Sequence, residues 1–413
     1  MSSTKKVLFF LILATLVFEI SKFYSFAENY SSWQYSDWLI NYEGGFVRRG
    51  FIGEILYFFH KSLFIDLDKL IFSFVIFIFI FISFFLFKSI EYIENNYENI
   101  LIFLSPGFFI YPIMNSEVIG RKEILFIFFF AFFVFFEKKI NNKYLFSSLI
   151  ISIIILCLSH SGFIFYSPYL IFLYILIKHN RSLKIKKLEI FSILLTILFL
   201  VIFIQYFSGS EIIIEQICLS VKEFASENCG KTGQIAWIDP TKVVRTALQD
   251  AASILDSNLD HRIFFHLYVF KEIFPNNLFI YFLSIILVFF FISIRLKNSK
   301  FNNMILNSKF ITPFFIFILL FIFTFPVYIL GRDWGRYIYI SYSSTFFIYV
   351  FCLKEKILTF KKYNFLWIHK LNKISLVMFI ILFCFSWTFP FYDAKSFKIT
   401  LKKPIHSLLK KIK

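Results

Sequence analysis

Long apolar runs recur along this chain, and they constrain its fold more than any other feature of the sequence. The runs from Val7 to Phe26, Leu70 to Phe87 and Phe310 to Leu330 each have about the 20 residues that a helix needs to cross ~30 Å of hydrocarbon. Backbone groups in hydrocarbon must bond to one another, and a helix satisfies them within a single segment. The sequence, which is 59% hydrophobic, therefore predicts an all-α polytopic membrane protein with one integral membrane domain over residues 1–413.

The apolar runs and the polar turns between them predict about eleven transmembrane helices. They cover, in chain order, residues 7–26, 70–87, 100–114, 124–136, 144–158, 163–177, 190–207, 278–294, 310–330, 337–353 and 374–391. Lys5 and Lys6 place the N-terminus inside, because loops rich in lysine and arginine stay on the cytoplasmic side. Lysine-rich residues 354–373 then also fall inside, whereas residues 208–277 form one long loop on the outer, periplasmic side.

Three segments are expected to differ from simple spans. The sequence Ser105–Gly107, with its central proline, predicts a break in the third run. Residues 51–59 alternate apolar and polar side chains at helical spacing, so this helix is expected to lie along the membrane surface or to re-enter it. The basic residues 393–413 fall outside after an eleventh span, against the usual charge bias. Either they form an amphipathic helix on the outer surface, or the last run is not a full span.

Composition excludes several classes of site. The net charge of +17 is spread over many short loops and forms no basic domain, so we predict no nucleic-acid partner. The sequence contains no CxxC or HExxH spacing, so we predict no metal site and no cofactor. Cys218 and Cys229 lie in the long loop, where a disulfide is plausible if that loop faces an oxidising compartment.

Arginine is scarce in this chain, which uses lysine freely for general charge. Seven of the nine arginines fall on the predicted outer side, opposite the lysine-rich loops. A guanidinium presents a planar fork that matches phosphate and carboxylate oxygens, which an ammonium does not. This one-sided distribution indicates an anionic ligand outside.

Four polar clusters lie on that same side. They are Ser36–Glu54, Gly120–Glu123, Ser159–Ser161 and Gly331–Arg336. The first is the densest in charged side chains, and its glycines suggest a turn where a ligand approaches the backbone closely. We expect all four clusters to meet and to bind an anionic, lipid-linked substrate.

The basic side chains of these clusters are the predicted substrate-binding residues. They are Arg48, Arg49, Arg121, Lys122, Arg332 and Arg336. Arginine pairs bidentately with phosphate oxygens, so together these cations could hold a diphosphate. The alternative is that they extend to the membrane interface and bind lipid headgroups.

Five carboxylates lie near these cations. They are Asp37, Glu43, Glu54, Glu123 and Asp333. Each is expected either to pair with a cation or to act as the general base that deprotonates a sugar hydroxyl. Glu54 and Asp333 are the preferred bases, because each ends a cluster beside a predicted span. His160, at the tip of an outer turn, is either structural or placed to bind a proton or phosphate.

These clusters resemble a known family. The segment DWLINYEGGFVRRGFIGE, the GRKE turn, an outward histidine before an aromatic-proline helix, and the DWGR turn are similar to polytopic proteins of bacterial surface-polysaccharide clusters. Those proteins are generally taken as O-antigen or capsule polymerases of the Wzy type, or as related glycosyltransferases of the GT-C type. Ser161 follows His160 where the resemblance leads us to expect an acidic residue.

The resemblance implies an enzyme of the bacterial inner membrane with its active face in the periplasm. It would polymerise undecaprenyl-diphosphate-linked repeat units, with membrane lipid and a chain-length regulator protein as further partners. Glu54, Asp333, His160 and Asp37 would be catalytic, while the basic residues and Glu43 would bind substrate. A GT-C transferase would instead use a polyprenyl-phosphate sugar and a carboxylate of the first outer loop, Asp37 or Glu43. A flippase or transporter would have functional charges on both faces of the membrane, whereas the four polar clusters of this sequence lie on one predicted side.

Overall fold

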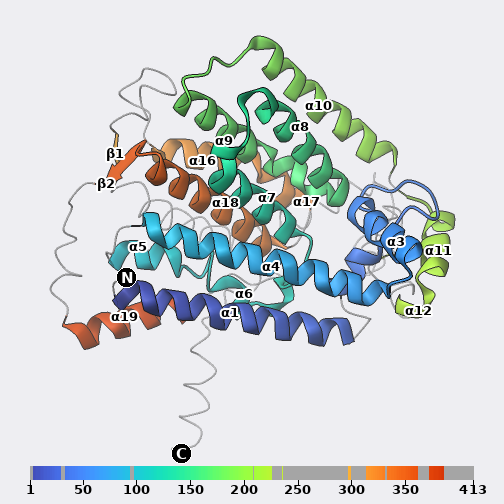
Figure 1. Ribbon diagram of the computed structural model, residues 1–413, viewed down its shortest axis with the longest axis horizontal. Coiled ribbons are helices and arrows are strands. Elements are labelled where there is room, and N and C mark those ends of the chain that lie inside the picture. The colour runs from blue at the N-terminus through green and yellow to red at the C-terminus, as the bar shows by residue number, and fades with distance from the viewer. Residues whose placement is uncertain are drawn as a thin grey trace, which may run out of the picture. The chain divides into compact units, whose positions relative to one another are not determined.

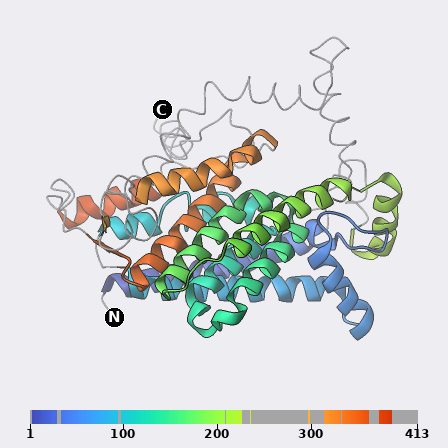
Figure 2. The same ribbon diagram turned by 90° about the horizontal axis from the view of Figure 1, so that it is seen from above.

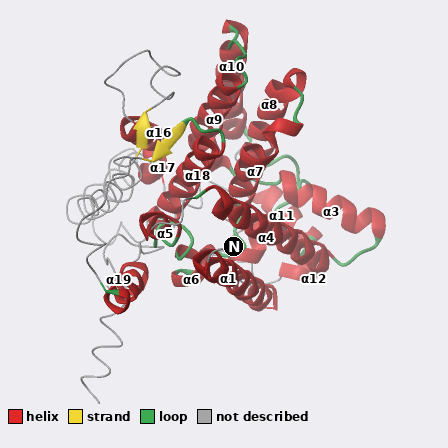
Figure 3. Ribbon diagram, turned by 60° about the vertical axis from the view of Figure 1, so that its left-hand side comes forward, coloured by secondary structure: helices red, strands yellow, loops and turns green. Residues whose placement is uncertain are grey.

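The computed structural model describes residues 3–28, 33–93, 97–207, 209–225, 235, 296–298, 313–330, 333–360 and 372–385. The regular secondary structure of these residues is helical except for one short ladder, in which β1 (Leu296–Asn298) pairs antiparallel with β2 (Leu358–Phe360) (Figure 3). The chain divides into two compact units, and two of the boundaries between them fall inside long helices, α1 (Ser3–Glu28) and α4 (Leu67–Tyr92). Unit 1 contains residues 1–12, 86–117 and 270–413, and unit 2 contains residues 13–85 and 118–269.

Two long helices contribute residues to both units, α1 (Ser3–Glu28) and α4 (Leu67–Tyr92). The other elements of unit 2 are α2 (Trp33–Ser36), η1 (Asp37–Leu39), α3 (Phe51–Leu63), α7 (Glu123–Phe136), η3 (Glu137–Lys139), α8 (Asn142–Ser159), η4 (Ser161–Tyr166), α9 (Ser167–Asn180), α10 (Lys187–Tyr206), α11 (Glu211–Ser220) and α12 (Lys222–Ala225). Those of unit 1 are α5 (Tyr97–Phe103), α6 (Tyr111–Met114), η2 (Ser116–Val118, whose last residue belongs to unit 2), α16 (Pro313–Phe323), α17 (Phe325–Leu330), α18 (Trp334–Lys354), α19 (Lys373–Phe385), β1 and β2.

Helix α8 is the packing centre of unit 2. It contacts α3, α7, α9 and α10, and Figure 1 shows α8, α9 and α10 side by side. Its buried side chains include Leu145, Leu149 and Leu156, which recur at the three- and four-residue spacing of one helix face. Helix α10 instead exposes large apolar side chains such as Phe191 and Phe199, as a helix that faces lipid does.

Five described helices are long and apolar enough to cross a membrane. They are Thr4–Glu28, Leu67–Tyr92, Asn142–Ser159, Ser161–Asn180 and Lys187–Ile204. These helices support a membrane-embedded protein and match five of the predicted spans. The prediction of about eleven spans is not confirmed by this criterion. The predicted span 278–294 lies outside the described residues, as do residues 226–234 and 236–277 of the long loop.

Other predicted spans form helices that are short or broken. The run 100–114 is interrupted, as predicted at Ser105–Gly107: α5 ends at Phe103, and the Ser105 hydroxyl accepts a hydrogen bond from the Gly107 N–H. The run 310–330 divides into α16 and α17, with the break two residues before Pro326, which lacks the donor that a continuous helix needs. Helix α7 has only 14 residues, or about 21 Å of length.

Helix α18 is the most enclosed helix of unit 1. Its side chains are buried at almost every position from Trp334 to Cys352. Tyr342 donates a hydrogen bond to the carbonyl of Ile102, and Tyr349 donates one to the Asn99 side chain, so the tyrosines of α18 fix it to α5. The aromatic and hydroxyl content that makes α18 less apolar than a lipid-facing span is therefore used inside the protein.

Charged side chains near the predicted inner ends of α7, α8 and α9 hold those helices together. Arg181 donates hydrogen bonds to the Glu137 carboxylate at 2.7 Å and to the Ile140 carbonyl at 3.0 Å. The Glu137 side chain is 1% exposed. By contrast, the Lys61–Glu43 pair is 52% and 37% exposed. The buried Arg181–Glu137 pair is therefore expected to matter more for stability than the exposed Lys61–Glu43 pair.

We expect Arg181→Ala to destabilise the protein far more than Lys61→Ala. Removing Arg181 leaves the buried Glu137 charge uncompensated, which costs about 3–5 kcal/mol. An exposed pair such as Lys61–Glu43 contributes less than about 1 kcal/mol. Thermal unfolding of the two variants in detergent checks this order. Equal shifts of the unfolding midpoint would show that Arg181 does not hold these helix ends.

Candidate functional site

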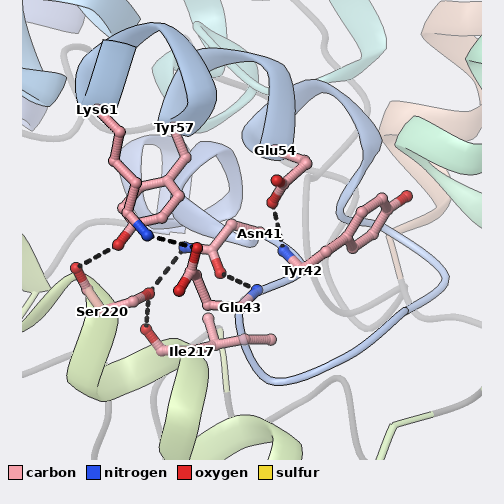
Figure 4. Close-up of polar contacts among 8 residues, drawn as sticks. All are labelled: Asn41, Tyr42, Glu43, Glu54, Tyr57, Lys61, Ile217 and Ser220. Carbon is pink, nitrogen blue, oxygen red and sulfur yellow. Dashed lines mark hydrogen bonds and ion pairs between the residues drawn. The ribbon is translucent and has the colours of Figure 1, made fainter.

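The first predicted outer loop, residues 36–54, is held from several directions inside unit 2. Trp38 donates its indole N–H to the Gly120 carbonyl at 2.7 Å, and the Arg48 N–H donates to the Phe207 carbonyl at 3.2 Å. Asn41 donates to the Ser220 hydroxyl at 2.9 Å (Figure 4). The loop is therefore tied to the turn before α7, to the end of α10 and to α11, three segments distant in sequence.

Helix α11 lies against this loop and against α3 (Figures 1 and 2). Tyr57 of α3 donates to the Ser220 carbonyl at 3.4 Å, and Ser220 donates to the Ile217 carbonyl at 2.7 Å. A Cβ atom on Gly44 would collide with the Ile213 carbonyl of α11. The glycine pair was predicted to let a ligand approach; here Gly44 admits another segment of the chain.

The loop's own carboxylates have different surroundings. Glu54 accepts a hydrogen bond from the Tyr42 N–H at 2.7 Å and so closes the loop onto the start of α3. Glu43 pairs with Lys61 at 2.6 Å on the surface (Figure 4). Asp37 is only 4% exposed and lies in η1 beside Lys122. Asp37 is therefore the loop carboxylate that faces a buried interior.

A buried polar cluster forms beneath this loop. We call it the buried cluster and define it as Asp37, Arg49, Arg121, Lys122, Glu123 and His160. Lys122 is fully buried; its ammonium donates to the Arg49 carbonyl at 2.7 Å and lies 3.8 Å from Asp37 Oδ1. His160 Nε2 lies 3.8 Å from Glu123 Oε1. Three of the four predicted clusters thus meet in unit 2.

Helix starts and turns supply these side chains. Asp37 begins η1, Lys122 caps α7, and Glu123 is the first residue of α7. His160 caps η4 with its ring, because Nδ1 accepts a hydrogen bond from the Gly162 N–H at 3.2 Å. Helix ends are suitable places for polar side chains between apolar helices. The backbone N–H and C=O groups at a helix end have no partner within the helix, so polar side chains there can pair with them.

Glu123, which lies beside His160, supplies the acidic partner that was expected next to His160 in the sequence. Ser161 occupies the position where an acidic neighbour was expected, and Glu123 supplies the carboxylate from a different helix. Glu123 was expected near the cations, whereas Glu54 and Asp333 were the preferred bases. Its place just before the apolar run 124–136 was the available signal, because a charge at that depth is costly.

Positive charge exceeds negative charge in the buried cluster. Arg49, Arg121 and Lys122 face two carboxylates, and His160 adds no charge while it is neutral. Arg49 has no ion-pair partner among the residues that the structure describes, and its Nε makes no hydrogen bond there. Arg121 is 4% exposed and lies over the Trp33 ring at 6.0 Å. The cluster is therefore suited to an anionic ligand.

Burial lowers the pKa of the Lys122 ammonium to about 8, although Asp37 opposes that shift. An anion bound beside it would favour the protonated form and raise the pKa again. Lys122 is thus a cation whose charge depends on what occupies the cluster.

The fourth predicted cluster belongs to unit 1. Asp333 precedes α18 and pairs with Arg336 at 2.7 Å, with the Arg336 side chain 8% exposed. Trp334 donates its indole N–H to the Tyr328 carbonyl at 3.0 Å and fixes the start of α18 against α17. Arg332 lies outside the described residues. Asp333, which was predicted as a base, therefore forms an ion pair with Arg336.

Two further predictions concern metals and cysteines. No group of three metal-ligating side chains occurs among the described residues. Cys218 of α11 is disulfide-bonded, and Cys229 lies outside the described residues. Cys157, Cys352 and Cys384 are free and buried, as expected for small apolar side chains.

The contact of Glu54 with the Tyr42 N–H predicts how two substitutions differ. Glu54→Gln keeps an acceptor oxygen, so stability and activity should stay near those of the wild type. Glu54→Ala leaves a part-buried N–H unsatisfied and should cost about 1–3 kcal/mol. Thermal unfolding in detergent measures stability, and complementation of a deletion strain tests the surface-glycan activity that the resemblance implies. A Glu54→Gln variant that folds normally but loses about 10²-fold or more of its activity would instead identify a base.

Comparison of the chain with protein-family models gives no match, and neither do comparisons with curated proteins and with solved structures. A functional assignment must therefore come from the chemistry of the site itself.

Proposed function

We propose that this protein polymerises oligosaccharide repeat units linked to undecaprenyl diphosphate, at the periplasmic face of the bacterial inner membrane. The observation that carries the proposal is the buried cluster, in which cations exceed carboxylates beneath a loop predicted to face outward. A diphosphate leaving group carries the charge that such a cluster would neutralise. Stabilising charge that develops on a leaving group is a major contribution to catalysis.

Arg49 and Lys122 are the groups best placed for the diphosphate. The Arg49 guanidinium has no acidic partner in the described part of the chain, so a phosphate would not have to displace one. Lys122 lies next to it, held through the Arg49 carbonyl. Arginine contributes a bidentate fork and lysine a point charge, a combination suited to adjacent phosphoryl groups.

The five helices able to cross a membrane support a lipid-linked substrate, since the site belongs to a membrane-embedded protein. Such a substrate carries its own energy in the sugar–phosphate bond, so no nucleotide sugar and no cofactor is required. Chain elongation in this way would draw on a growing glycan as donor and a new repeat unit as acceptor. A chain-length regulator would be a natural protein partner of that reaction.

One observation favours a second candidate, a GT-C-type transferase with a polyprenyl-phosphate sugar donor. That class of enzyme was expected to use a carboxylate of the first outer loop. Of the two candidates, Asp37 is buried beside Lys122 while Glu43 is exposed and paired with Lys61. The two functions differ in product: a polymerase makes long chains, and a transferase adds one sugar.

Surface-glycan banding of a deletion strain tests the proposal. We expect single-repeat glycan in the deletion and a ladder after complementation with the wild type. Arg49→Ala should restore no ladder, because the cluster loses the cation whose guanidinium has no acidic partner in the described part of the chain. Lys69→Ala, which alters an exposed pair with Asp66, is the matched control and should restore the ladder. Long chains that lack one sugar would favour the GT-C transferase, and lipid-linked units accumulating on the inner face would favour a flippase.

The pKa of Lys122 predicts a pH dependence of ligand binding. Because burial lowers the pKa of Lys122 to about 8, the ammonium is charged below that pH and neutral above it. Binding of farnesyl diphosphate to the purified protein should therefore weaken up to about tenfold per unit as the pH rises above ~8. Lys122→Arg, which stays charged, should remove this dependence. Affinity that does not change between about pH 7 and about pH 9.5 would show that Lys122 does not bind the anion.

A further inference from the structure

We infer that Glu19 is an intramembrane carboxyl group that binds a proton at neutral pH, and that it is the residue of this protein that a hydrophobic carbodiimide modifies. Glu19 lies in α1, one of the five helices long and apolar enough to cross a membrane. It lies outside the buried cluster, and no step of the proposed transfer reaction uses it. The inference therefore does not rest on the proposed function and can fail without affecting it.

The depth of Glu19 in the membrane decides which of its two forms is favoured. Glu19 precedes Glu28, the last residue of α1, by nine residues, so it lies ~14 Å along the helix from that end. The hydrocarbon of a bilayer is ~30 Å thick, and α1 is only slightly longer than that thickness, so Glu19 lies well inside the hydrocarbon. An ionised carboxylate at this depth is costly unless it meets a cation, whereas a protonated carboxyl group is neutral.

Glu19 belongs to the face of α1 that packs inside the protein. Thr15 and Phe23, one helical turn to either side, are 9% and 0% exposed. Residues four apart lie on the same helix face. Val17, on the opposite side of the helix, is 66% exposed. Glu19 itself is half-buried, so its side chain lies at the margin between the packed face and the lipid.

The helix that packs against this face offers no charge. Phe23 stacks on Phe72 of α4 with the ring centroids 6.1 Å apart and meets Phe79 edge-on at 6.2 Å. Figure 1 shows α1 and α4 side by side. Residues 70–87 of α4 contain no charged side chain. Within the part of the chain that the structure describes, Glu19 forms no hydrogen bond and no ion pair, so its charged form lacks a partner.

The cations closest to Glu19 along the chain and in unit 2 have other surroundings. A Cβ atom on Gly120 would lie 2.1 Å from the Phe23 ring, so the turn with Arg121 and Lys122 meets α1 one helical turn nearer to Glu28. Lys122 is held by groups of the buried cluster, and Arg121 lies over an aromatic ring. Lys22, three residues after Glu19, is exposed. It is the cation that competes with a proton for Glu19, and the test below includes it.

A protonated carboxyl group in lipid is the group that dicyclohexylcarbodiimide modifies. The carboxyl proton passes to one nitrogen of the carbodiimide, and the carboxyl oxygen forms a bond to its central carbon. The acyl group then moves from that oxygen to a nitrogen and gives a stable N-acylurea. All atoms of both reactants remain in the product, so no leaving group and no further reactant is involved. The reagent partitions into lipid and so reaches a half-buried side chain of a spanning helix.

The test maps this modification on the full-length protein, both in native membranes and purified in detergent. Each sample is treated with dicyclohexylcarbodiimide at neutral pH, and mass spectrometry of its peptides locates the N-acylurea. The variants are Glu19→Gln, Lys22→Gln and the matched control Glu28→Gln, which removes an exposed carboxylate from the end of the same helix. Elution as a single species and thermal unfolding show whether each variant is folded.

We expect the adduct on Glu19 of the wild type in both samples, at a level at least about tenfold above that on Glu28. Glu19→Gln should abolish this adduct. Its unfolding midpoint should match that of the wild type, because glutamine has the shape of the protonated acid and carries no charge. Glu28→Gln and Lys22→Gln should be labelled at Glu19 as strongly as the wild type.

Four results would overturn the inference. Absence of an adduct on Glu19 in both samples would show that the carboxylate is ionised there. An adduct in detergent but not in native membranes would show that a cationic group of another membrane protein pairs with it. Labelling that rises several-fold in Lys22→Gln would assign the charge to a pair with Lys22. A Glu19→Gln variant that fails to fold, or unfolds far below the wild type, would show that a charged partner had been lost.

Discussion

The buried ammonium of Lys122 is the interaction on which the candidate site depends. An unpaired charge in an apolar interior is costly, so the surrounding chain must satisfy it. It is satisfied by the Arg49 carbonyl at 2.7 Å and by Asp37 at 3.8 Å, both from the loop of residues 36–54. That requirement joins the turn before α7 to residues more than seventy positions earlier. The loop of residues 36–54, the turn at Gly120–Lys122 and the start of α7 therefore form one structural unit, although they are distant in sequence.

The same arrangement bears on both the stability of the site and its proposed chemistry. Buried ion pairs contribute little net stability, because desolvation offsets their attraction. What they provide here is an unequal set of charges in a low-dielectric space, where each charge acts strongly on a neighbour. The surface pair of Glu43 and Lys61 shows the contrast, since solvent screens it. Function is thus expected where the charges are enclosed, and loop stability where hydrogen bonds such as that of Glu54 close the backbone.

Membrane embedding places a second constraint on the helices. The long helices α4 and α10 expose large apolar side chains such as Phe77 and Phe191, whereas α18 is buried along nearly its whole length. Short α7 and the broken run of α5 and α6 leave backbone groups near their ends, and these groups need partners inside the protein. The Trp38 bond to Gly120 and the Tyr342 bond to Ile102 are such partners. Polar side chains are therefore concentrated where helices stop.

The sequence by itself determined the helical membrane class, the ends of the five long apolar helices to within about five residues, the break at Ser105–Gly107 and the polar segments of the site. These follow from hydrophobic run length and from proline chemistry, which act locally. Tertiary structure decided which carboxylate meets which partner. Glu54 could not be assigned to the Tyr42 N–H, nor Glu123 to His160, because those pairs depend on how helices pack and not on spacing along the chain. Gly44 shows the same dependence on packing, because what approaches it is the carbonyl of Ile213, a residue of a helix far along the sequence.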